Sequence, residues 1–259
     1  PIIPFNYYSE KDRYEILRFL TNIYLLSVNN SFSIKKLFNK NDFRHWEKYD
    51  LLRKRVRKNL LLGYIAIDNF KSYHPFLNEN IIAERSGLNK LLTRNKLKGS
   101  IVFDCGSCHG DSTWQLNYDL KPKLVVSIEP MKNLYQQLLR NIRLNRIINV
   151  LPLNIGVGDK ITTAHMTNKG GMSSISEKGV LVKIDTIDNI VNRENLGHIG
   201  LIKMDIEGYE YNALIGARET IKRHKPALII AIYHKGRDFF EIPKLIKEMV
   251  PSYKLRFAN

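Results

Sequence analysis

The chain has 259 residues, which suits one large domain or one domain with a smaller appendage. Its 44% of hydrophobic residues suffice for a sizeable core and exclude a disordered chain. An excess of 41 Lys and Arg over 25 Asp and Glu gives a formal charge of +16, which suits nucleic acid, an anionic membrane or a phosphorylated small molecule as partner. The codon bias of an AT-rich genome would produce the same excess of Lys, so the charge does not choose a function.

Cysteine content and hydropathy bear on localisation. Two cysteines cannot build a disulfide framework, which favours a reducing compartment. The longest apolar stretch, residues 14–28, is interrupted by Arg18 and Asn22 and is too short and polar to span a bilayer. No signal peptide is visible from Pro1 onward. We therefore predict a cytoplasmic protein with no transmembrane segment.

The N-terminal part has a helical pattern. Residues 1–80 are predicted to be a helical N-terminal region, with helix over residues 10–62. Apolar residues recur there at steps of three and four: Ile16, Leu17, Leu20, Ile23 and Tyr24. A basic run follows them: Arg53, Lys54, Arg55, Arg57 and Lys58. This run would suit contacts with phosphates, but a solvated helix face is the commoner interpretation.

From residue 81 onward, strands alternate with helices. Strands are predicted at residues 101–103, 124–128, 149–153, 201–204 and 227–233, and a sixth begins at residues 253–257. Helices are predicted at residues 131–145, 209–225 and 241–249, and Pro226 ends the second of these. This alternation predicts an α/β domain over residues 81–259, with a mostly parallel, doubly wound sheet.

A turn with two glycines follows the first of these strands. Gly106 and Gly110 let the backbone approach a ligand, and the next helix presents free N–H groups. The G-x-x-x-G spacing differs from that of dinucleotide-binding turns and favours a ligand without a diphosphate. Asp104 at the strand tip is expected to order the turn or to hold an amino group. The predicted ligand-binding residues are Asp104, Gly106, Ser107, Gly110, Asp111 and Ser112.

Glu129 ends the second strand and lies 19 residues beyond Gly110. An acidic residue at about this spacing is placed to hydrogen-bond the two hydroxyls of a ribose. An ordinary surface Glu before Pro130 is the alternative. The position at a strand tip favours ribose binding.

Residues 105–109 also match the C-x-x-C-H pattern of haem attachment and contain the redox pattern C-x-x-C. Covalent haem requires export, and no signal peptide is visible. A structural zinc site would need two more ligands at close spacing, and the sequence offers none there. We set haem and zinc aside and keep a redox pair as a minor alternative.

Charged residues and a histidine follow the fourth and fifth strands. In open parallel sheets the ligand crevice lies at these strand ends, so Asp205 and Glu207 are expected to face it, with Lys203 nearby. Glu210 is expected to cap the next helix or to face solvent. His234 ends the fifth strand and is expected to neighbour Asp205.

These residues resemble the FkbM-type methyltransferases over roughly residues 81–257. The K-x-D-x-E-G segment at residues 203–208 is the most specific part, whereas many methyltransferases share the glycine turn. The chain departs from the family at residues 107–109, Ser-Cys-His, where the family shows a small residue and then Asn. The matching stretches are residues 103–106 with Gly110 and Thr113, and residues 127–130, 154–159, 187–188, 202–210 and 232–235.

The resemblance implies a Rossmann-like class I methyltransferase fold with S-adenosylmethionine as methyl donor. It would place the adenosine against Glu129 and residues 104–112, the adenine beside Asn154 and Ile155, and the sulfonium near Asp205. It also implies O-methylation, with sugars of surface polysaccharides and natural products among the acceptors. Methyltransferases of this fold resemble one another in a C-terminal hairpin. Residues 253–257 supply only its first arm, so we expect an incomplete hairpin and a longer native chain.

We predict methyl transfer to a hydroxyl of a small or carbohydrate acceptor, such as a sugar nucleotide. His234 is the first candidate for the general base. Asp205 would orient it, act as base itself, or bind a divalent metal. Lys203 would set the charge of the cluster or hold a substrate phosphate, and Glu207 completes the predicted catalytic group.

Two other classes of function compete with this prediction. An RNA methyltransferase would explain the charge better, but the sequence shows no RNA module and no N/D-P-P-Y motif. A binding module with a decayed site is disfavoured, because Glu129, Asp205 and His234 are present together.

Overall fold

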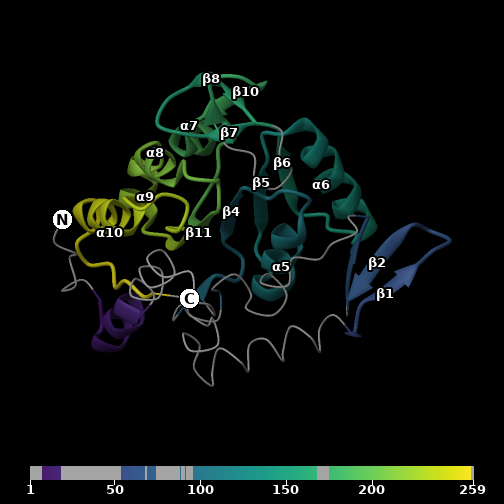
Figure 1. The fold of residues 1–259 in the computed structure, drawn as a ribbon, viewed down its shortest axis with the longest axis horizontal. Helices are drawn as coiled ribbons and strands as arrows, with labels where there is room; N and C mark the ends of the chain where they lie inside the picture. Colours follow the sequence, from purple (N-terminus) through teal and green to yellow (C-terminus); the bar gives the residue numbers. More distant parts are fainter. Residues whose placement is uncertain are drawn as a thin grey trace, which may run out of the picture.

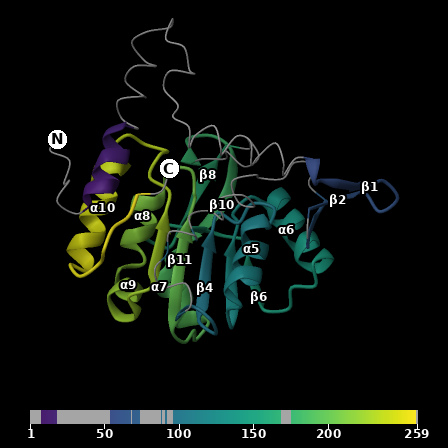
Figure 2. The same cartoon turned by 90° about the horizontal axis from the view of Figure 1, so that it is seen from below.

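The computed structural model describes residues 8–18, 54–67, 69–73, 88, 91, 96–167 and 175–257. Its centre is a five-stranded sheet with the order β12-β11-β4-β5-β6 (Figure 1). All four strand pairings are parallel, as Figure 2 shows for β4 and β11 side by side. The predicted α/β class and parallel sheet are therefore confirmed. The strands are β4 (Ile101–Cys105), β5 (Leu124–Ile128), β6 (Val150–Leu153), β11 (Ile199–Met204) and β12 (Ala227–Ile230).

Helices cover both faces of this sheet, because alternate residues of a strand point to opposite sides. Ile101 and Phe103 of β4 belong to the core cluster that includes the helices from residue 187 onward. Val102, between them, belongs to a second cluster with Leu116 and Leu120. The helices are α5 (Asp111–Leu120), α6 (Lys132–Leu144), α7 (Ile187–Arg193), α8 (Glu210–Ile215), α9 (Arg218–His224) and α10 (Asp238–Met249).

Most predicted elements agree with the structure, with corrections at three places. The helix predicted at residues 209–225 is divided into α8 and α9 around Gly216, where a Cβ would lie 1.9 Å from the carbonyl oxygen of Gly158. The fifth strand ends at Ile230 rather than at residue 233. Residues 253–257 do not add a strand to the central sheet, because Leu255 forms only an isolated bridge with Tyr8. The expectation that the C-terminal hairpin is incomplete stays a prediction.

A second sheet, which the sequence analysis missed, lies between β6 and α7 in the chain. Its order is β7-β10-β8-β9. Two of these strands have only two residues each, too few for an alternating pattern to be recognised. The strands are β7 (Gly156–Val157), β8 (Thr162–Met166), β9 (Ile175–Ser176) and β10 (Val180–Asp185).

The N-terminal region is only partly helical among the described residues. Residues 10–18 form a helix, as predicted. Residues 57–72 instead form an antiparallel sheet of β1 (Arg57–Asn59), β2 (Tyr64–Ile67) and β3 (Phe70–Ser72), so the helical prediction is wrong there. Ile65 and Ile67 of β2 are buried on one face, and this period of two outweighs the helical pattern before it. The predicted domain boundary at residue 81 lies outside the described residues.

The part of the chain that the structure describes bears on the prediction that no segment spans a membrane. None of the helices in that part of the chain is both long and apolar enough to cross a bilayer.

Candidate active site

The glycine turn after β4 lies directly against the end of β11. Gly106 has a φ of +80°, and a Cβ on it would lie 1.9 Å from the carbonyl oxygen of Asp205. The backbone N–H groups of Gly106 and Ser107 both donate to the carbonyl of Ile128 at 3.0 Å. Only glycine fits the first turn position, which brings the ends of β4, β5 and β11 together. The Ser107 hydroxyl also donates to Ile128, at 3.2 Å, so this predicted ligand residue serves the turn in the structure.

A buried ion pair between Lys203 and Asp104 supports this turn. The Nζ atom of Lys203 lies 3.2 Å from Oδ1 of Asp104, and both side chains are almost fully buried. The hydroxyls of Ser112 and Thr113 donate to the other Asp104 oxygen at 2.7 and 2.8 Å. Of the two roles expected for Asp104, this geometry favours ordering the turn.

The burial of Lys203 also bears on its role. Burial alone would lower its pKa, but the negative charges of Asp104 and Asp205 outweigh burial and raise the pKa, so the ammonium stays charged. Because this ammonium faces Asp104 and is hidden from solvent, the geometry suits an electrostatic role and does not suit binding of a substrate phosphate.

Glu129 lies at the end of β5 with only 5% of its surface exposed. Its two carboxylate oxygens accept the backbone N–H groups of Cys108 at 3.0 Å and Met131 at 2.9 Å. Burial raises the pKa of Glu129 to about 7, against the lowering effect of these two hydrogen bonds. Each oxygen keeps a lone pair for another donor, so the carboxylate fits the predicted contact with ribose hydroxyls.

Asn154 holds the backbone at and just after Glu129. Its amide donates to the carbonyls of Glu129 and Pro130 at 2.9 and 3.0 Å. The residue itself is exposed. It therefore joins β5 to the segment after β6, where the resemblance expects the adenine.

The part of the turn that departs from the family contains Cys108 and His109, which are in contact with each other, and His109 also contacts Asp111. Cys108 Sγ lies 3.3 Å from Nδ1 of His109, and Nε2 of His109 lies 3.3 Å from Oδ2 of Asp111. Burial alone would lower the pKa of His109, but Asp111 and Cys108 together raise it to about 10. In the structure, Asp111 therefore pairs with His109. Gly110 is the N-cap residue directly before α5 and has a φ of +93°. A Cβ on Gly110 would clash with the side chain of Leu138.

Both cysteines of the C-x-x-C pattern are free thiols. Cys105 is fully buried within β4, and burial raises the pKa of its thiol. A protonated, inaccessible thiol reacts slowly in exchange, so this arrangement does not favour the redox interpretation.

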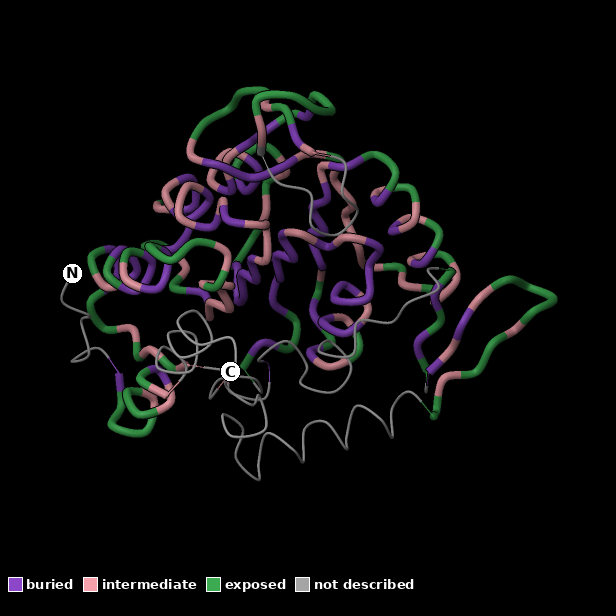
Figure 3. Tube along the Cα trace, in the orientation of Figure 1, coloured by how far each residue is buried: buried purple, intermediate pink, exposed green. Residues whose placement is uncertain are grey.

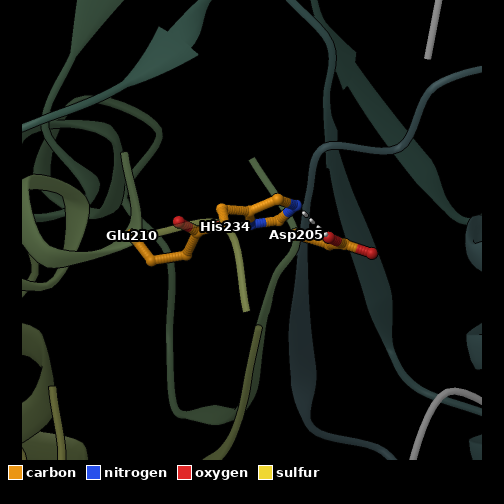
Figure 4. Close-up of side chains that lie close together, drawn as sticks. All are labelled: Asp205, Glu210 and His234. Atoms are coloured by element: carbon orange, nitrogen blue, oxygen red, sulfur yellow. Dashed lines mark ion pairs between the residues drawn. The ribbon is translucent and has the colours of Figure 1, made fainter. Parts of the chain in front are cut away.

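His234 lies among three carboxylates, and Figure 4 shows two of them, those of Asp205 and Glu210. Its Nε2 atom is 3.5 Å from Oδ1 of Asp205 and 3.6 Å from Oε2 of Glu207, while Nδ1 is 2.9 Å from Oε1 of Glu210. The predicted proximity of Asp205 and His234 is therefore confirmed. Glu207 reaches the cluster from a backbone φ of +57°, an uncommon conformation for a residue other than glycine.

Glu210 differs from its prediction. Its side chain has no exposed surface, so the expectation that it would face solvent is wrong. The Oε1 atom accepts the backbone N–H of Ile206 at 2.8 Å and also faces His234. The reason is that α8 begins at Glu210 itself, which directs the side chain back toward the strand ends.

The carboxylates set the charge of His234. Burial alone would lower its pKa, but the contact with Glu210 and the charges of Asp205 and Glu207 outweigh burial and raise the pKa above the ordinary value. Tyr233, which the sequence analysis did not select, donates its hydroxyl to Asp205 at 2.8 Å. The only sequence signal for Tyr233 was its place beside His234.

Three of these residues also form a candidate metal site. Asp205, Glu210 and His234 each offer one ligand atom, and these atoms lie within 4.8 Å of one another. Carboxylate oxygens with one imidazole are a ligand set that several divalent cations accept. Nε2 of His234 faces Asp205 and Nδ1 faces Glu210, so a bound ion would use only one of the two nitrogens.

The fold and the site together define a class of protein. A parallel sheet carries a glycine turn, a carboxylate at the next strand tip and charged residues at two further strand ends, which is typical of Rossmann-like domains that bind a nucleoside-containing cofactor. Residues 104–253 match the family model described as the methyltransferase FkbM domain, and the chain belongs to this family. The predicted resemblance is therefore confirmed, and the cofactor is S-adenosylmethionine.

A solved structure with a similar fold supports the architecture. A crystal structure of methyltransferase FkbM from Methylobacillus flagellatus is similar with a TM-score of 0.51 and 22% identity, over 83% of this chain and 56% of that one. The chain thus spans little more than half the length of that protein. M. jannaschii TYW2 in complex with AdoMet matches with a TM-score of 0.27 and 28% identity, over 38% of this chain and 41% of that one. Trm5b from Pyrococcus abyssi matches with a TM-score of 0.39 and 16% identity, over 75% of this chain and 45% of that one.

No curated protein matches the chain.

Proposed function

We propose that the chain transfers a methyl group from S-adenosylmethionine to a hydroxyl of a small or carbohydrate acceptor. The observation that carries this proposal is the position of His234, whose Nε2 faces Asp205 at the strand ends that also carry the glycine turn. Membership of the FkbM methyltransferase family supports the reaction class. The donor, when bound, supplies a methyl group that its sulfonium already activates.

The residues around Gly106 are suited to hold this donor. Glu129 would accept the ribose hydroxyls, and the turn up to Ser112 would lie against the nucleoside. Asn154 would border the adenine, since it fixes the backbone after Glu129. The bare Cα of Gly106 lets the backbone of Asp205 approach the glycine turn closely, so Asp205 would lie near the sulfonium.

His234 would act on the acceptor. In its neutral form, Nδ1–H faces Glu210 and the lone pair of Nε2 is free to accept the proton of the acceptor hydroxyl. The donor would supply the methyl group to the acceptor oxygen and leave as a neutral thioether, and the proton would remain on His234. Asp205 and Glu207 would stabilise the imidazolium that forms, because both lie within 3.6 Å of Nε2.

A role for Asp205 as base or as metal ligand is the alternative within the same site. The set of Asp205, Glu210 and His234 would suit a divalent cation that acidifies the hydroxyl.

The kind of acceptor is the least constrained part of the proposal. A hydroxyl of a sugar nucleotide or of a polysaccharide sugar, reached in the cytoplasm, fits a general base of raised pKa. RNA is the second candidate, and the net charge of +16 favours it.

Methyl transfer from labelled donor to a panel of sugar nucleotides, polysaccharide extracts and RNA tests the proposal, with products located by mass spectrometry. The proposal expects label on a sugar oxygen, and the variant His234→Ala in the same panel serves as control. Label only on a nucleobase would overturn the acceptor class. A folded protein that binds the donor and labels nothing would overturn the activity.

A further inference from the structure

The hairpin of β1 and β2 ends in three leucines that are exposed to solvent. Leu60 is 90% exposed, Leu61 94% and Leu62 58%. The hairpin projects from the rest of the described chain in Figures 1 and 2, and Figure 3 shows its far end as exposed. Three adjacent leucines at a projecting tip are unusual for a surface that contacts only water, and such apolar surfaces commonly mark a binding site.

The tip has a defined conformation. The N–H of Leu62 donates to the side-chain oxygen of Asn59, and the N–H of Gly63 donates to the Asn59 carbonyl, both at 2.9 Å. Gly63 has a φ of +68°, which glycine adopts at no steric cost. The leucines are therefore held outward by the turn.

The base of the hairpin is attached to the methyltransferase domain. β2 pairs with β3, and the side chain of Asn145 at the end of α6 receives the N–H of Lys71 and donates to its carbonyl. Asn141 accepts the N–H of Tyr73 at 3.0 Å. The tip is thus presented by an arm that is fixed on α6.

The arm is strongly basic next to the apolar tip. Residues 51–67 contain no Asp or Glu. Arg57 and Lys58, which Asn59 separates from the leucines, are exposed, and so are Lys54 and Arg55. Arg57 and Lys58 of β1 therefore place two exposed cations beside the leucines, in a segment without acidic residues.

An anionic bilayer surface fits both features at once. Leucines that enter the boundary between headgroups and acyl chains leave water, and adjacent Lys and Arg remain at the level of the lipid phosphates. Nucleic acid fits only the charge, because residues 57–63 contain no aromatic side chain that would stack on bases. We propose that the β1–β2 hairpin docks the protein on a membrane that contains anionic phospholipid, with Leu60, Leu61 and Leu62 inserted. The proposal does not depend on the acceptor of the methyl group.

Co-sedimentation of the full chain with lipid vesicles tests this proposal. Vesicles of phosphatidylcholine and phosphatidylglycerol in equal parts should bind the protein, and vesicles of phosphatidylcholine alone should bind it much more weakly. The double variant Leu60→Ser/Leu61→Ser and the double variant Arg57→Ser/Lys58→Ser should each weaken binding by about tenfold or more. High salt should weaken binding of the wild type, because it screens the cationic residues.

Matched controls separate docking from general stickiness. Ile148, which is 97% exposed between α6 and β6, provides the apolar control Ile148→Ser. Lys254 and Arg256 are exposed near the C-terminal end and provide the charge control Lys254→Ser/Arg256→Ser. Both controls should bind vesicles like the wild type, and all variants should melt like it, because every altered side chain is on the surface.

Two results would overturn the proposal. The first is wild-type protein that fails to bind the anionic vesicles, including the case in which the leucines instead join two copies and the measured mass in solution doubles. The second is binding that the leucine variant retains in full, since a purely electrostatic contact with any polyanion would then account for it.

Discussion

Glu210 Oε1 lies 2.9 Å from Nδ1 of His234, and the Glu210 side chain has no exposed surface. The contact joins the first residue of α8 to the segment after β12. A carboxylate beside Nδ1 favours a proton on that nitrogen, and the carboxylates of Asp205 and Glu207 beside Nε2 favour a second proton there, which raises the pKa of His234. Glu210 is therefore placed to orient His234, and the orienting role offered for Asp205 in the sequence analysis stays a prediction.

Replacing Glu210 should change the pH dependence of turnover. A base must lose its proton before it acts, so the raised pKa of His234 places the acidic limb of the pH–rate profile above the position for an ordinary histidine. The variant Glu210→Gln removes the negative charge at Nδ1, lowers the pKa of His234 and should move this limb to lower pH. Glu241→Gln, on the exposed part of α10, is the matched control. An unmoved limb in Glu210→Gln would contradict this role.

Removing the imidazole should affect turnover far more than donor binding. His234→Ala is expected to lower the turnover number by about 10²–10⁴, the range typical of a general base. Calorimetry with S-adenosylhomocysteine should give nearly the wild-type affinity, because Glu129 and the glycine turn lie on other strands. A melting curve must first show that the variant folds. Normal turnover would leave Asp205 as the remaining candidate base.

The sequence predicted what depends on local pattern. Residues 124–128 form β5 as predicted. The position of the candidate ligand residues at strand tips follows from the predicted parallel sheet. The sequence did not predict the hairpin, because Leu60, Leu61 and Leu62 continue an apolar pattern and a helix accounts for them equally well. Nor did it predict the burial of Glu210, which depends on where α8 packs. Such features arise from tertiary contacts that local periodicity does not contain.

Chelation should separate a histidine base from a metal. Glu210 Oε1 already accepts the N–H of Ile206 and faces His234, so a cation bound there would have to disrupt both contacts. We therefore expect EDTA to leave turnover unchanged. Loss of activity that Mg²⁺ or Mn²⁺ restores would instead establish Asp205, Glu210 and His234 as a metal site.

Lys203 should behave as a structural residue. Lys203→Met would leave Asp104 charged and unpaired in the core, which should lower the free energy of unfolding by about 3–5 kcal/mol. Chemical denaturation measures this value, and Lys244→Met on the exposed face of α10 should change it by less than about 0.5 kcal/mol. A variant that kept its stability while its KM for a phosphorylated acceptor rose would support the phosphate-binding role instead.

Donor affinity should depend on the ionisation of Glu129. Burial raises its pKa to about 7, so the carboxyl group is largely protonated at about pH 6 and largely ionised at about pH 8. The ionised form would accept both ribose hydroxyls and keep the N–H groups of Cys108 and Met131. Binding of S-adenosylhomocysteine should therefore tighten as pH rises through this range.

Two variants make this last prediction specific to Glu129. Glu129→Ala should weaken binding by about 1–3 kcal/mol at high pH, which corresponds to the loss of charge-assisted hydrogen bonds. Glu129→Gln keeps the size of the side chain but cannot ionise, so its affinity should be nearly flat with pH. Calorimetric titrations at both pH values compare the three proteins directly. If the wild type is also flat, or if Glu129→Ala binds as tightly as the wild type, Glu129 does not hold the ribose and serves only to accept the backbone of the glycine turn.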